Sequence, residues 1–252
     1  MSIRSIITFT VLIVTICACQ PFGNQDRKYP STIGTFNVTG DFTINPTTIL
    51  DSLNRGETNV FTSTLATPGD DTILPSGSIQ WTQSDYLKVA NTLSQFVWKE
   101  PLDGWLIYYL RLENVCQDNL NGFDSFTAIY YKTIGWGLGK MYTARYIEIY
   151  PLASIVYWAG DTDFPVSSSW AAIDISKFKI TADDALRIAE KNGGRETRAR
   201  AHNYCSVSVN LPVHKNDQRW DVAYYYSPSF EIIVDPYSGK YEIPTPVPTP
   251  SP

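Results

Sequence analysis

The chain has 252 residues, a formal net charge of −5 and 43% hydrophobic residues, with 7 tryptophans and 16 tyrosines. This composition supplies enough apolar material for one large or two small folded domains. The acidic balance, without a cluster of lysine and arginine, argues against nucleic acid as a partner, because neutralising phosphates requires clustered positive charge.

Residues 1–18 have the pattern of a secretory signal peptide. Arg4 precedes an apolar run at 6–16 that is shorter than the roughly 20 residues a membrane-spanning helix needs. The run leads into the sequence ICAC at 16–19, which resembles a bacterial lipobox. That resemblance implies acylation of Cys19 and a palmitate-bearing lipoprotein, anchored through its N-terminus to the extracytoplasmic face of the cell membrane. An ordinary signal peptide with two incidental cysteines is the alternative.

The next segments carry weaker patterns. Residues 19–31 are polar and proline-containing, as expected of a tether between lipid and domain. Residues 32–80 form an N-terminal extension that is hard to place. Within it, 32–65 fits one or two strands and a short turn that cover an edge of the first sheet, and 66–80 is loop-rich.

A first helix is predicted to begin after Thr82 and to continue to about Trp98. Thr82 and Asp85 have the spacing of a capping box, and apolar residues recur along one face. Four strand-like runs rich in aromatic and β-branched residues follow, at 105–113, 126–134, 141–150 and 154–158. The glycine-rich segment 135–140 fits a hairpin loop better than a phosphate cradle, because it does not lie between a strand and a helix.

The second helix is the most complete element, in the stretch ITADDALRIAEKNGG at 180–194. Thr181 and Asp184 again form a capping box, and Gly193 or Gly194 is predicted to end the helix. One face is apolar. The other face is predicted to be solvated and carries Asp183, Asp184, Arg187, Glu190 and Lys191.

Four strands are predicted after this helix as well, at 205–211, 219–226, 230–234 and 241–243. Residues 81–90 align with 180–189 without a gap, which indicates an internal duplication. The predicted fold is α+β, with two tandem units at 81–160 and 180–243 joined by a connector at 161–179. Each unit is one helix packed on a four-stranded antiparallel sheet. The proline-rich tail at 244–252 is predicted to be disordered, either as a passive end or as a spacer or ligand for an envelope partner.

The second unit resembles the PepSY domain. The resemblance rests on the helix ITADDALRIAEKNGG and on the closing hairpin EIIVDPYSGKYEI. The first unit looks like a degenerate copy that lacks the glycine pair. The resemblance implies a small cystatin-like α+β unit outside the cytoplasm, in a family for which peptidase inhibition has been proposed. No catalytic residues come with this family.

Two cysteines remain after Cys17 is removed with the signal peptide and Cys19 is acylated. Cys116 follows the first strand of the first unit, and Cys205 opens the first strand of the second. An even pair in an oxidising compartment predicts a disulfide between the two units. Two buried thiols are the alternative.

Several polar groups have residue types that occur in chemical sites, but each fits a structural role better. The candidates are His202 and His214 as metal ligands or acid–base groups, the serines at 167–169 as nucleophiles, Asp118, Asn119, Asn121 and Asp124 or Asp161 and Asp163 as calcium ligands, and Asp183, Asp184 and Glu190 as glycosidase carboxylates. None has the spacing that its chemistry requires. We therefore expect no catalytic residue, no metal and no cofactor.

The aromatic residues point to the expected function. Core packing explains Trp81, Trp105, Trp158 and Trp220 better than stacking on sugars does. Alternation in the strands leaves further tyrosines on both faces of the sheet, more than one core needs. We expect a regulatory module that binds an extracytoplasmic protein or peptide without catalysis. A hydrolase with loop carboxylates and a structural envelope lipoprotein are the alternatives.

Overall fold

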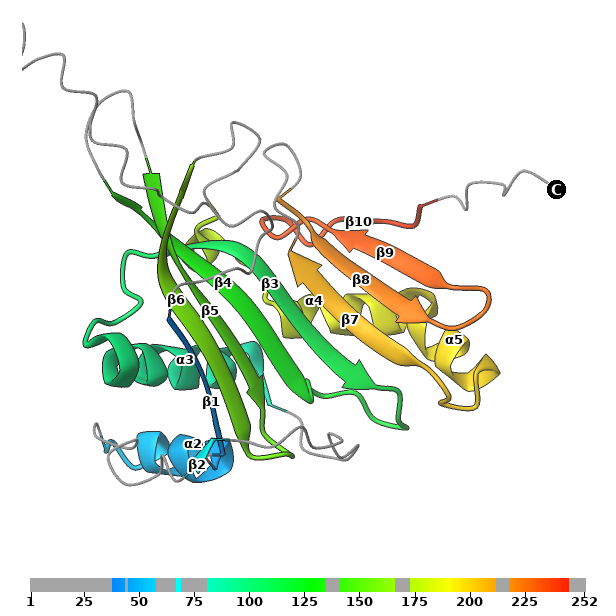
Figure 1. Ribbon diagram of the computed structural model, residues 1–252. Coiled ribbons are helices and arrows are strands. Elements are labelled where there is room, and N and C mark those ends of the chain that lie inside the picture. Colours follow the sequence, from blue (N-terminus) through cyan, green and yellow to red (C-terminus); the bar gives the residue numbers. More distant parts are fainter. Residues whose placement is uncertain are drawn as a thin grey trace, which may run out of the picture.

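Ten strands form one continuous antiparallel sheet in the computed structural model, which describes residues 38–43, 45–57, 67–68, 81–134, 141–165, 173–211 and 218–244 (Figure 1). The strands are β1 (Val38–Thr43), β2 (Thr67–Pro68), β3 (Leu106–Val115), β4 (Ser125–Ile134), β5 (Met141–Tyr150), β6 (Ile155–Pro165), β7 (Ser206–Leu211), β8 (Trp220–Tyr225), β9 (Phe230–Val234) and β10 (Tyr241–Glu242). Their order is β10-β9-β8-β7-β3-β4-β5-β6-β1-β2. The α+β class is confirmed.

The strands of the two halves join in the middle of this sheet. β3 pairs with β7 in an antiparallel ladder that runs from Leu110 opposite Leu211 to Val115 opposite Ser206. On one side of the ladder β3 to β6 follow one another as a meander, and on the other side β7 to β10 do the same. The two sets therefore share one sheet instead of forming two separate sheets.

The N-terminal extension contains two strands, β1 and the short β2 in the segment predicted to be loop-rich, and an unexpected helix. β1 pairs with β6 and so lies on the edge of the first meander. The helix α2 (Pro46–Asn54) was not predicted, although its start carries two ordinary helix signals. The Asn45 side chain accepts the Thr48 amide at 3.0 Å, and Pro46 occupies the first helical position.

Some predictions fall outside the described residues. These are the signal peptide with Cys19, the tether, the loop 135–140, the serines 167–169, His214 and the tail from 245 onward.

The helices α3 (Gln83–Trp98) and α4 (Ala182–Ala189) lie on the same face of the sheet, with their N-termini meeting near its centre (Figure 1). Both begin with the predicted capping box. Each helix also caps the other. The Gln83 amide donates to the Asp183 carboxylate at 3.0 Å, and the Ala182 amide donates to the Gln83 side-chain oxygen at 2.7 Å.

The main core lies between these helices and the sheet. Tyr86 and Leu93 of α3 and Leu186 of α4 are buried against inward-facing side chains of both meanders, so the described halves share one continuous core. The four tryptophans predicted for the core are all buried: Trp81, Trp105, Trp158 and Trp220. Their predicted packing role is confirmed.

The second helix does not end at the glycine pair. Gly193 has the predicted positive φ, +123°, but the chain continues through the distorted turn Glu190–Gly194 into a further helix, α5 (Arg195–Arg200). A Cβ at Gly194 would lie 2.4 Å from the Tyr224 hydroxyl, so the glycine permits close packing on β8. The glycines therefore bend the helix and do not end it. The bend places Arg198 of α5 next to Glu190, with which it forms an ion pair.

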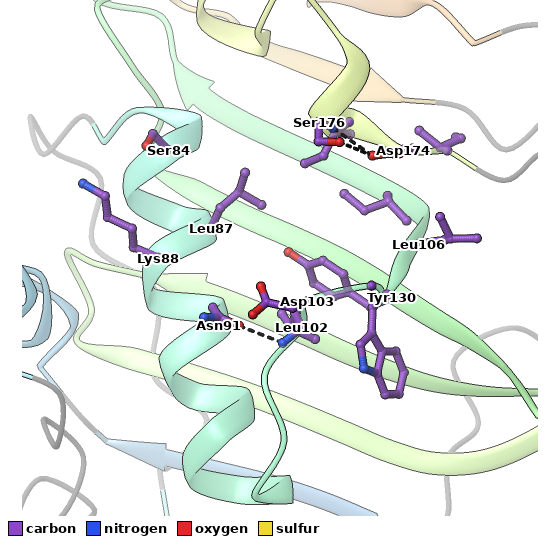
Figure 2. A pocket seen from close by; sticks show the side chains of 15 residues that line it. Ser84, Leu87, Lys88, Asn91, Leu102, Asp103, Leu106, Tyr130, Asp174 and Ser176 are labelled. Carbon is purple, nitrogen blue, oxygen red and sulfur yellow. Dashed lines mark hydrogen bonds between the residues drawn. The ribbon is translucent and has the colours of Figure 1, made fainter.

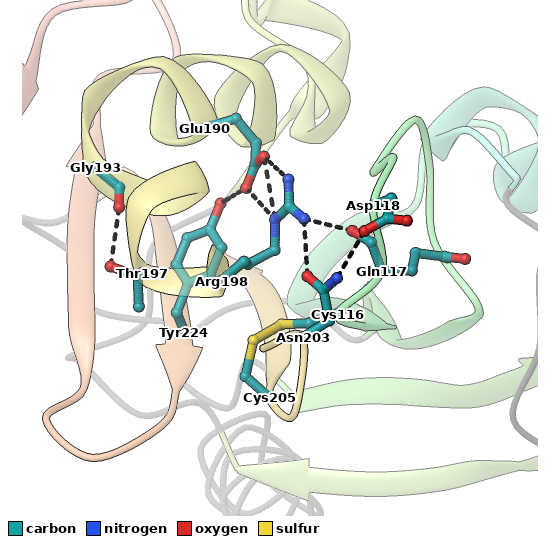
Figure 3. Close-up of polar contacts among 10 residues, drawn as sticks. All are labelled: Cys116, Gln117, Asp118, Glu190, Gly193, Thr197, Arg198, Asn203, Cys205 and Tyr224. Atoms are coloured by element: carbon teal, nitrogen blue, oxygen red, sulfur yellow. Dashed lines mark hydrogen bonds and ion pairs between the residues drawn. A yellow bond between two sulfur atoms is a disulfide. The ribbon is translucent and has the colours of Figure 1, made fainter. Parts of the chain in front are cut away.

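The predicted solvated face of the second helix is wrong at two positions. Glu190 is buried and pairs with Arg198 of α5, and its carboxylate also accepts the Tyr224 hydroxyl at 2.7 Å (Figure 3). Asp183 is half-buried because it caps α3. The error arises because helical periodicity does not reveal that a neighbouring helix supplies a partner for each carboxylate.

A polar network and a disulfide join the two halves beside this buried ion pair. Arg198 also donates to the carbonyl of Gln117, and Asn203 donates to Asp118 at 2.8 Å (Figure 3). The disulfide Cys116–Cys205 closes the same end of the β3–β7 ladder, with a Cα–Cα distance of 5.2 Å. The predicted pairing of these cysteines is present, and the alternative of two buried thiols is not.

Replacing both cysteines by serine should lower the free energy of unfolding by about 3–5 kcal/mol, because the disulfide closes a loop of 89 residues in the unfolded chain. Urea unfolding of the oxidised protein and of the Cys116→Ser/Cys205→Ser variant measures this difference. Mass spectrometry without reduction should find neither thiol open to alkylation, and labelling of both would contradict the bond.

Candidate functional site

The face of the sheet opposite α3 and α4 is one candidate binding surface. Side chains alternate along each strand, so those that flank the core residues point to this other face. Tyr108, Ile129, Tyr131 and Ala144 form a second apolar cluster there, separate from the main core. We call this surface the helix-free face. Its strands β3 to β9 carry the side chains considered next.

A polar row crosses the helix-free face. Cross-strand registers place Asp221 beside Asn210, Asn210 beside Arg111, Arg111 beside Thr127, and Thr127 beside Glu148. The row thus runs from β8 to β5 across the ladder that joins the two halves. All five residues are half-buried, so the row is only partly open to solvent.

Tyrosines surround the end of this row. Glu148 lies opposite Tyr157 of β6, and Tyr146 and Tyr150 flank it on its own strand. Burial raises the pKa of Tyr146 and of Tyr150, and the nearby Glu148 carboxylate raises both further. These phenols therefore stay protonated at physiological pH. The rings of Tyr150 and Tyr157 meet edge to face, with centroids 6.1 Å apart.

The described strands give the helix-free face a negative charge. Glu113, Glu148, Asp221 and Glu231 contribute carboxylates, whereas Arg111 is the single cation that these strands direct to this face. Arg111 pairs with Glu113, and both side chains remain about one-third exposed, at 35% and 38%. The surface therefore combines partly exposed tyrosine rings with an excess of carboxylates.

A pocket on the other side of the sheet is a second candidate. It lies between α3, the start of β3 and the segment 173–176, and its volume is about 560 Å³ (Figure 2). The Asn91 side chain accepts the Leu102 amide at 2.7 Å and so fixes the loop at its edge. Sequence reasoning missed this pocket, because its walls come from segments far apart in the chain.

The polar residues that the sequence singled out do not assemble into a chemical site. Within the described residues no group of three or more histidine, cysteine or acidic side chains is placed to hold a metal ion. Asp118 bonds to Asn203, and the Asp124 carboxylate accepts the Val115 amide at 2.8 Å. His202 is exposed at the end of α5. Asp161 and Asp163 lie on β6, with side chains outside the described part of the structure.

Comparisons with known proteins give no identification. No family model, no curated protein and no solved structure matches the chain. The resemblance of the second half to the PepSY domain therefore remains a prediction. Among the described helices, none has the length and apolar character needed to cross a membrane.

Asp124 should make stability depend on pH. Burial raises the pKa of its carboxyl group from 3.8 to about 6, so the folded state holds this proton more tightly than the unfolded state. Stability should therefore fall as the pH rises from about 4 to 6. Asp124→Asn keeps the acceptor for Val115 and removes the ionisation. The variant should gain about 1–2 kcal/mol relative to the wild type between pH 4 and pH 7, after allowance for partial exposure.

Chemical unfolding at several pH values measures this gain. Asp124→Ala is the matched control, because it loses the acceptor for the Val115 amide and should be destabilised at every pH. A parallel pH profile for the wild type and Asp124→Asn would show that this carboxyl group does not titrate in the window.

Proposed function

We propose that this protein is a lipid-anchored, extracytoplasmic binding module whose helix-free face binds a basic segment of a protein or peptide partner. The observation that carries the proposal is the combination of tyrosines and unbalanced carboxylates on that face. Lysine and arginine side chains are attracted both by carboxylates and by the faces of aromatic rings. Tyrosine also supplies a large contact area at a small entropic cost.

The arrangement of the two halves supports a duplicated origin. Each half has a capping-box helix followed by four strands in meander order, and the two helix starts align at 81–90 and 180–189. We infer two tandem units, each related to one helix on a four-stranded sheet. Joining the two units widens the face that a partner can contact. The PepSY-like second unit favours a peptidase or its substrate as that partner.

The anchor follows from the lipobox-like sequence at 16–19. Cys19→Ser should abolish incorporation of a labelled fatty acid and release the protein from membranes, because the acyl chains supply the membrane affinity. Metabolic labelling and membrane fractionation measure both effects. Persistent acylation of the variant would contradict the assignment of Cys19, and an unanchored wild-type protein would favour an ordinary signal peptide.

Capture of a partner tests the binding function. Immobilised protein should retain a specific partner from native membrane extracts, and retention should fall steeply with salt between about 0.05 and 0.5 M. Glu148→Lys should reduce retention at least about tenfold, because it places a cation among the tyrosines. Glu196→Lys is the matched control, with the same charge change at an exposed position of α5, and should retain the partner normally.

Other outcomes would favour the rival functions. Equal retention by Glu148→Lys and wild type would remove the helix-free face as the binding surface. Hydrolysis of a peptide, glycoside or ester by the purified protein, abolished by one carboxylate substitution, would establish an enzyme instead.

A further inference from the structure

Tyr130 and Trp105 both line the pocket between α3 and β3, and we call these two residues its floor. The Tyr130 hydroxyl and the Trp105 indole N–H are both enclosed, and neither has a hydrogen-bond partner among the described residues. The residues themselves are 4% and 8% exposed. In Figure 2 the Tyr130 hydroxyl is directed toward α3, into the space that Leu87 and Asp103 border. A buried polar group without a partner is costly, so a ligand that satisfies it gains affinity.

The surroundings of Trp105 hold its ring in position. The Arg145 guanidinium lies 4.1 Å from the ring centroid, and Trp98 stacks near the same guanidinium, at 4.8 Å. Arg145 is itself buried and bonds to Ser94 at 2.7 Å and to Glu100 at 2.9 Å. The indole N–H is therefore a fixed donor, and binding a ligand would require little reordering of the floor.

The walls are apolar, and the mouth carries opposite charges. Half-buried or buried leucine and isoleucine side chains form the walls: Leu87, Leu102, Leu106, Ile107, Ile173 and Ile175. Asp103, Asp174 and Lys88 stand among the polar residues that line the rest of the pocket. Asp174 pairs with Lys177 at 3.2 Å, so the carboxylates and ammonium groups around the pocket balance, and neither sign of ligand charge is favoured.

We propose that this pocket binds an uncharged ligand with a branched or aromatic apolar group and a hydrogen-bond acceptor oxygen, such as a carbonyl. An indole N–H can only donate, and a phenol can donate as well, so both floor groups are satisfied by acceptor oxygen. The apolar walls take the hydrocarbon part. Because both floor atoms are enclosed, contact with the oxygen requires a shift of the half-buried leucine side chains in the walls, while the floor itself stays in place.

This site is independent of the proposed partner surface, because the pocket and the helix-free face lie on opposite sides of the sheet. The neutral probe N-acetyl-L-leucine amide carries both required features, and N-acetyl-L-leucine is its matched carboxylate. Titration of the purified protein, followed by saturation-transfer NMR, should detect the amide. The carboxylate should bind at least about threefold more weakly, because its charge would lose water between apolar walls.

Two variants locate the binding. Tyr130→Phe should weaken binding of the amide about three- to tenfold, the effect of one lost hydrogen bond. Ser84→Trp should abolish binding, because the exposed Ser84 borders the mouth and the larger ring fills it. Tyr225→Phe, a tyrosine of the helix-free face, is the matched control and should bind normally. Glu148→Lys should also leave amide binding unchanged, so the two proposals fail separately.

Thermal unfolding supplies a second readout for Tyr130. Removing a hydroxyl that no described residue partners should leave the unfolding midpoint of Tyr130→Phe unchanged or slightly raised. A clear fall of the midpoint would show that the hydroxyl is already satisfied inside the protein and would overturn the proposal. No binding of the amide up to its solubility, or binding that Tyr130→Phe and Ser84→Trp both leave intact, would overturn it as well.

Discussion

The antiparallel ladder between β3 and β7 turns two meanders into one sheet, and the contacts between the two described halves are arranged around it. At one end of the ladder the disulfide Cys116–Cys205 and the bond from Arg198 to the Gln117 carbonyl hold the strands together. On the face of the sheet that the helices cover, the side chains of Gln83 and Asp183 tie the starts of α3 and α4 to each other. Both candidate binding surfaces are built across or beside this ladder.

Meeting helix N-termini have an electrostatic cost that the sequence offsets. Each N-terminus carries a partial positive charge, so two of them in contact repel each other. The Asp183 carboxylate lies between them and accepts the first amide of α3. Burial raises the pKa of Asp183, so the loss of water around this carboxylate offsets part of what its hydrogen bond to the Gln83 amide contributes. Glu190 and Arg198 form a second buried pair. Desolvation offsets much of the attraction between such charges, so their main effect is to fix the position of α5 relative to α4.

The two faces of the sheet have different chemistry because only one of them is covered by α3 and α4. Under the helices, the enclosed Tyr130 hydroxyl and Trp105 indole N–H have no partner in the described part of the chain, and both residues line a pocket with apolar walls. On the helix-free face, tyrosines and carboxylates share a row that stays partly exposed. A single sheet can therefore present a neutral, donor-lined site on one side and an acidic, aromatic one on the other.

Most local elements could be predicted from the sequence. Capping boxes at Thr82 and Thr181 predicted the starts of α3 and α4, alternation predicted the strands of both meanders, and the even cysteine count predicted the disulfide. These features depend on residues near one another in the chain or on residue counts. The pairing of β3 with β7, the burial of Glu190 and the pocket that Tyr130 and Trp105 line became visible only in the folded chain. Each of these depends on side chains brought together from distant segments. Helical or strand periodicity shows only which residues of one element share a face, and so it cannot identify such partners.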